Sequence, residues 1–174
     1  DREGLNYATS TRFVPDNCEE EVIRLLYDIS SRMPLYNSDP EGPFNARQNA
    51  MIAVHAEIYY RSMIRGGAES WNIRDTHMTG TLERILNYHG PESKAIVWEH
   101  NTHIGDARAT DMASSEMVNV GQLVREKWGE DYSVAVGFGS YEGSVVASRS
   151  WDAPMEEMPM PPARDNSWEY FLHH

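Results

Sequence analysis

Apolar residues recur at helical spacing through the first half of this chain, and the spacing then changes. The helical pattern covers about 16–33, 45–65 and 72–88, and two shorter helices are expected at 118–128 and after Ser167. Residues 95–98 instead form a short, continuous apolar run, which is typical of a strand buried on both faces. Further strands are expected at 132–138 and 144–147, and residues 155–166 are expected to be irregular. This order predicts a layered α/β domain with a helical insertion.

Charge and cysteine content exclude several classes of protein. The 174 residues include 27 acidic and 15 basic side chains, a net charge of −12, which disfavours nucleic-acid binding and strongly anionic substrates. The single cysteine, Cys18, excludes an intramolecular disulfide framework and a cysteine-rich zinc module. No stretch is long and apolar enough to span a bilayer. We therefore expect a cytoplasmic protein that has neither a nucleic-acid nor a membrane partner.

The strongest candidate site follows the apolar run and consists of Glu99, His100, Asn101 and His103. Ligands bind at the carboxyl ends of strands in open α/β sheets, and an imidazole there can exchange a proton with water. The second imidazole or Asn101 could hold an oxyanion. Two alternatives stay open: both histidines are polar loop residues, or both are metal ligands. Their spacing of three differs from the four of the helical zinc motif, and no third ligand is evident.

Arg74 and Asp75 form a second candidate site at the start of the helix expected over 72–88. The helix dipole favours Asp75 there but disfavours Arg74, which needs a carboxylate partner or an anionic ligand unless it is simply solvated. His77 on the same turn is interpreted as a surface residue, and His55 as a buried core histidine.

Two of these segments, 70–78 (SWNIRDTHM) and 97–106 (VWEHNTHIGD), resemble the erythromycin esterase family. Segments 45–50, 56–61, 118–122, 136–139 and 161–164 fit the same family in the same order, so the resemblance covers nearly the whole chain. It implies a three-layer α/β fold with a helical insertion. It also implies hydrolysis of an ester by water that a histidine activates, as in the macrolide-resistance members, which hydrolyse the lactone of erythromycin without a required metal.

The resemblance also implies which residues line the cleft. The family's His-Asn-x-His segment corresponds to His100, Asn101 and His103, and its Arg-Asp-x-x-Met segment to Arg74, Asp75 and Met78. The motif that carries the general base has no counterpart here. We therefore expect residues 1–174 to be the middle-to-C-terminal part of such a domain, mainly helical over 1–66 and α/β over 67–174.

These observations predict a hydrolase that acts on a small-molecule carboxylic ester or lactone and uses no cofactor. The expected catalytic residues are His100 and His103, and the expected substrate-binding residues are Arg74, Asp75, Glu99 and Asn101. Two other functions remain open: a metal-dependent hydrolase with both histidines as ligands, and a noncatalytic relative that only binds a small molecule.

Overall fold

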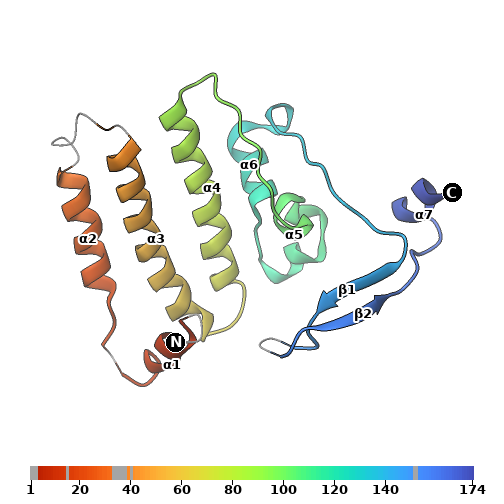
Figure 1. Cartoon of the computed structure of the whole chain (residues 1–174), viewed down its shortest axis with the longest axis horizontal. Helices are drawn as coiled ribbons and strands as arrows, with labels where there is room; N and C mark the ends of the chain where they lie inside the picture. Colours follow the sequence, from red (N-terminus) through yellow and green to blue (C-terminus); the bar gives the residue numbers. More distant parts are fainter. Residues whose placement is uncertain (1–3, 15, 33–38, 40, 151–152) are drawn as a thin grey trace. The chain divides into compact units, whose positions relative to one another are not determined.

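The computed structural model describes residues 4–14, 16–32, 39, 41–150 and 153–174 (Figure 1). It divides the chain into two compact units, Asp1–Ala135 and Val136–His174, each described by itself below. The first contains α1 (Leu5–Ser10), α2 (Glu19–Arg32), α3 (Glu41–Met63), α4 (Glu69–His89), α5 (Asn101–Ile104), α6 (Val120–Trp128) and the short 3-10 helices η2 (Ala107–Ala109), η3 (Asp111–Ser115) and η4 (Glu130–Tyr132). The second contains β1 (Gly143–Ala147), β2 (Glu156–Met160) and α7 (Trp168–His173).

Helices α2, α3 and α4 lie side by side in the first unit (Figure 1). The rings of Phe44 and Tyr88 stack with centroids 4.2 Å apart, and Arg84 Nε donates to Gln48 Oε1 at 2.7 Å. Because the start of α3 therefore meets the end of α4, these two helices are antiparallel. The helical pattern predicted all three, and the structure confirms them.

His77 lies in the interface between α3 and α4, so its interpretation as a surface residue is wrong. It is half-buried, and its ring contacts that of His55 with centroids 4.4 Å apart. Burial, the neighbouring His55 and the charge of Arg84 lower the pKa of His77 to about 4. His55 is likewise half-buried.

The packing of α5 on α6 depends on one glycine. A Cβ at Gly121 would overlap the backbone carbonyl oxygens of Ile104 and Gly105. Only glycine therefore allows the two segments to approach this closely. A salt bridge of 2.8 Å between Lys127 and Glu83 joins α6 to α4.

The strand predicted at 95–98 is not present. Residues 93–100 are neither helix nor strand, and Ile96 is 94% exposed. Residues 133–140 also lie outside any strand, and Val134 is 91% exposed. A strand needs a neighbour to complete its backbone hydrogen bonds, and among the described residues neither segment joins the sheet.

The second unit holds the sheet that the described residues form. Strands β1 and β2 pair antiparallel, with Val145 opposite Met158. The prediction that residues 155–166 are irregular is wrong for the part that forms β2. Pro159 is tolerated in this strand because both strands of a two-stranded sheet are edge strands. Helix α7 is capped as expected, by Ser167 Oγ, which accepts from Tyr170 N.

The described chain is therefore mainly helical with a small antiparallel sheet, which is compatible with the expected α/β class. The division at residues 66 and 67 into a mainly helical and an α/β segment stays a prediction. Among the described helices, none has the length and apolarity needed to cross a membrane.

Candidate functional site

Helix α4 supplies one side of the site. Arg74 and Asp75 lie three and four positions after Trp71, so each is its neighbour on the helix surface. The helix begins at Glu69, so Arg74 and Asp75 occupy its second turn rather than its start, and the helix dipole does not decide which charge is favoured there. The side chain of Asp75 is fully buried, whereas that of Arg74 is 38% exposed.

The segment before α6 is hydrogen-bonded to this face of α4. Trp71 Nε1 donates to the carbonyl oxygen of Val118 at 2.7 Å, and Val118 N donates to Asn72 Oδ1 at 2.9 Å. Val120 N donates to Asp75 Oδ2 at 3.1 Å. These bonds fix the start of α6 against α4.

Asn119 connects the start of α6 to α5. This side chain is 1% exposed. Its Nδ2 donates to the carbonyl oxygen of Thr102 at 2.8 Å, and its Oδ1 accepts from Ala107 N at 3.2 Å and from Gln122 N at 2.9 Å. One buried amide therefore caps α6 and holds in place the short helix that carries His103.

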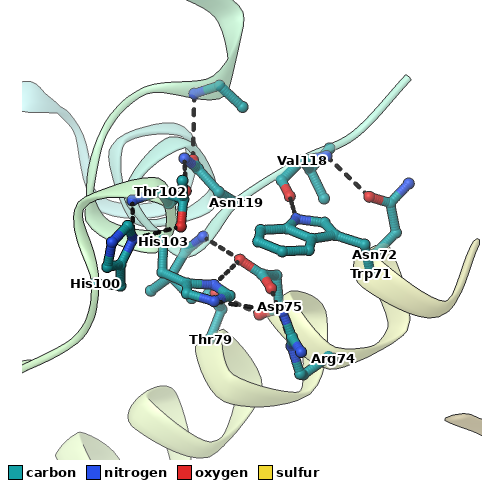
Figure 2. Close-up of polar contacts among 12 residues, drawn as sticks. Trp71, Asn72, Arg74, Asp75, Thr79, His100, Thr102, His103, Val118 and Asn119 are labelled. Atoms are coloured by element: carbon teal, nitrogen blue, oxygen red, sulfur yellow. Dashed lines mark hydrogen bonds and ion pairs between the residues drawn. The ribbon is translucent and has the colours of Figure 1, made fainter. Parts of the chain in front are cut away.

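His103 is the residue on which these contacts converge (Figure 2). Its Nδ1 lies 2.8 Å from Asp75 Oδ2, and its Nε2 lies 3.4 Å from Arg74 Nη2. Its ring stacks on Trp71 with centroids 4.6 Å apart and planes at 4°. With a carboxylate at Nδ1 and a guanidinium at Nε2, the neutral ring carries its proton on Nδ1 and presents a lone pair at Nε2.

Two carboxyl groups lie near this ring. Burial raises the pKa of Asp75, and the hydrogen bond and charge of His103 oppose that rise. Burial also raises the pKa of Glu99, an effect that Asp75 strengthens while His103 and Arg74 oppose it. Glu99 Oε2 is buried without a hydrogen-bond partner among the described residues. The site therefore combines two desolvated carboxyl groups, an imidazole and a guanidinium.

The family model of erythromycin esterase matches residues 2–174. The chain belongs to the erythromycin esterase family. This confirms the family resemblance, and the matched range includes every residue of the site described above. No solved structure matches the chain.

His100 and Asn101, the other expected residues of the candidate site, are both exposed. His100 caps α5: its Nδ1 accepts from Thr102 N at 3.2 Å and lies 2.9 Å from Thr102 Oγ1. Its ring is turned toward Thr102 rather than toward Asp75 (Figure 2). Because Nδ1 is an acceptor, the proton of the neutral ring lies on Nε2.

Metal binding by the two histidines is one of the two alternatives that the sequence leaves open at this site. In the part of the chain that the structure describes, no group of three His, Cys, Asp or Glu side chains is placed to hold a metal ion. His103 is bonded to Asp75 through Nδ1 and His100 to Thr102 through Nδ1, so each histidine has a protein partner.

Sequence reasoning did not assign a role to Trp71 or Asn119. Both lie in segments that fit the erythromycin esterase family, and Asn119 precedes an amphipathic run as a helix cap does. Their contacts with His103 and Thr102 join segments at least 17 residues apart, so spacing along the chain gave no signal of them.

Proposed function

We propose that this chain belongs to a hydrolase of carboxylic esters or lactones, and that His103 exchanges a proton with the substrate. Asp75 positions the ring, and Arg74 stabilises the negative charge that develops. The observation that carries this proposal is the geometry of His103: Nδ1 lies 2.8 Å from a fully buried carboxylate while Nε2 lies beside a partly exposed guanidinium.

This geometry assigns the two ring nitrogens different tasks. A hydrogen bond from Nδ1 to a buried carboxylate fixes the ring and stabilises its protonated form. As water adds to the ester, negative charge develops on the ester oxygen, and the proton that the water loses to the general-base histidine passes to Nε2 of the neutral His103 ring. Nε2 then gives this proton to the leaving alkoxide as the C–O bond of the tetrahedral intermediate breaks, so His103 ends neutral again. The guanidinium of Arg74, 3.4 Å from Nε2, lies where it stabilises the same charge. In this proposal, the general-base histidine that the family resemblance implies activates the water.

The remaining expected residues have supporting roles in this proposal. His100 offers its Nε2–H, and Asn101 its amide, as hydrogen-bond donors to the substrate. Glu99 lies near Arg74 and His103, and when it is ionised its negative charge stabilises a positive charge on either group. The three-layer α/β fold that the family resemblance implies is part of the same proposal.

The test is hydrolysis of a panel of p-nitrophenyl esters and macrocyclic lactones by the full-length protein. His103→Gln is expected to lower kcat by about 10²–10⁴, the usual contribution of a positioned proton-transfer group. His89→Gln is the matched control, because His89 is an exposed histidine in the last turn of α4. It is expected to leave kcat unchanged.

The alternatives give different outcomes in the same assay. Saturable binding of a substrate without turnover by the parent protein would favour the noncatalytic relative. Loss of hydrolysis on exhaustive chelation, restored by one added divalent metal, would favour the metal-dependent hydrolase. Equal kcat values for His103→Gln and the parent would refute the role of His103.

A further inference from the structure

Trp71 contacts two groups of the proposed site, the imidazole of His103 and the guanidinium of Arg74. Its indole stacks on the His103 ring at 4.6 Å and 4°, and the guanidinium carbon of Arg74 lies 4.7 Å from the indole centroid. The indole is itself held by the 2.7 Å hydrogen bond from Nε1 to the carbonyl oxygen of Val118 (Figure 2). The indole of Trp71 therefore has a fixed orientation, and the side chains of His103 and Arg74 pack on it.

The hydrogen bond to Asp75 leaves one rotation of the His103 ring undetermined. A single bond from Nδ1 fixes the direction of that nitrogen, but the ring plane can still turn about the line joining Nδ1 to the carboxylate oxygen. Stacking at 4° on an indole whose own orientation is fixed removes this freedom. Together the two contacts determine where Nε2 points.

The indole also favours the charge state that the proposed reaction needs. The face of an aromatic ring is electron-rich and attracts cations, and Trp attracts them best. The guanidinium of Arg74 already lies against the ring of Trp71. An imidazolium formed on His103 would meet the same kind of surface.

We propose that Trp71 is a positioning residue that sets the plane of the His103 ring and holds Arg74 beside Nε2. This inference rests on the proposed function, because it concerns the same proton-exchanging ring. Trp71 itself is not placed in contact with the reacting atoms.

The test compares Trp71→Phe and Trp71→Leu in the complete protein. Phenylalanine keeps an aromatic face but loses the Nε1–H, whereas leucine loses both the face and the donor. Trp128→Leu is the matched control, because Trp128 is a half-buried tryptophan on α6 with a lysine ammonium 5.6 Å from its ring centroid. Thermal denaturation establishes that each variant is folded.

Two readouts separate positioning from general destabilisation. We expect Trp71→Leu to lower kcat at least tenfold with KM within threefold, and Trp71→Phe to restore most of kcat. In proton NMR of the parent, the stacked indole is expected to shift the ring protons of His103 upfield, and this shift should disappear in Trp71→Leu and persist in Trp71→Phe.

Equal losses of kcat in Trp71→Leu and Trp128→Leu would overturn the proposal, as would unmoved His103 resonances in Trp71→Leu. If the parent hydrolyses no ester, the proposed function fails, and the NMR comparison alone decides whether Trp71 orients the ring. If Trp71→Leu does not fold, the decision rests on Trp71→Phe, which must keep both the upfield shift and most of kcat.

Discussion

Replacing Asp75 by Asn tests the central pair of the site, because it changes charge with little change of shape. Oδ2 of Asp75 interacts with both His103 Nδ1 and Val120 N, at 2.8 and 3.1 Å. An amide oxygen in the same place accepts both bonds, so the geometry is kept. What is lost is the negative charge that stabilises an imidazolium.

The size of the effect on rate follows from that charge. A hydrogen bond to a charged group contributes about 1.5–3 kcal/mol. If this contribution is made only when His103 is protonated in the transition state, its loss lowers kcat by about 10- to 160-fold.

The same substitution is not expected to lower the stability of the fold. Burial raises the pKa of Asp75 above its ordinary value, so between the unfolded and folded pKa values the folded state binds more protons. The free energy of unfolding therefore falls as pH rises through that window, and at neutral pH the buried carboxylate destabilises the fold. Asp75→Asn removes this cost and is expected to keep or raise Tm.

The assay measures kcat for a p-nitrophenyl ester and Tm at neutral pH in the same preparations. Asp131→Asn, at an exposed position in η4, is the matched control and should leave both unchanged. A kcat of Asp75→Asn within threefold of the parent, in a folded protein, would refute the reasoning.

The packing of the first unit gives two further predictions. The pKa of His77 is lowered from 6.5 to about 4, so between these two pH values the folded state binds fewer protons than the unfolded state. The free energy of unfolding is therefore highest above pH 6.5 and falls as the pH drops from 6.5 to 4. Glutamine does not titrate, so His77→Gln should reduce this fall in the free energy of unfolding. Because His77 is partly exposed, we expect the reduction to be about 1–2 kcal/mol, measured by denaturant titration at several pH values. Gly121→Ala should cost about 3 kcal/mol or more by the same titration, because its Cβ would overlap backbone at Ile104 and Gly105.

Helices α2, α3, α4, α6 and α7 were predictable because their signals are local. Asn17 Oδ1 accepts from Glu19 N at the start of α2, and Gly90 N donates to the carbonyl oxygen of Leu86 at the end of α4. Such caps and the apolar spacing between them lie within a few residues of each other. The prediction that His77 is a surface residue failed because a neighbouring helix, not the sequence of α4, decides which face is covered.

The strands were less predictable because a strand is defined by its neighbour. The apolar run at 95–98 has the composition of a buried strand, yet it joins no sheet among the described residues. Residues 156–160, rich in Met and Glu and containing Pro159, had no such composition and nevertheless pair with β1. Composition gives the tendency to extend, and pairing is decided by residues elsewhere in the chain.

The site shows the same dependence on distant residues at the level of single side chains. Helix α5 has four residues, too few to be stable alone, so the direction of His103 cannot come from the helix that carries it. It comes from Asn119, which holds the backbone of α5, and from Asp75 and Trp71, which hold the ring. The sequence indicated the charged groups because their types imply chemistry. It did not indicate the groups that orient them, because an indole or a buried amide acquires that role only from what it touches.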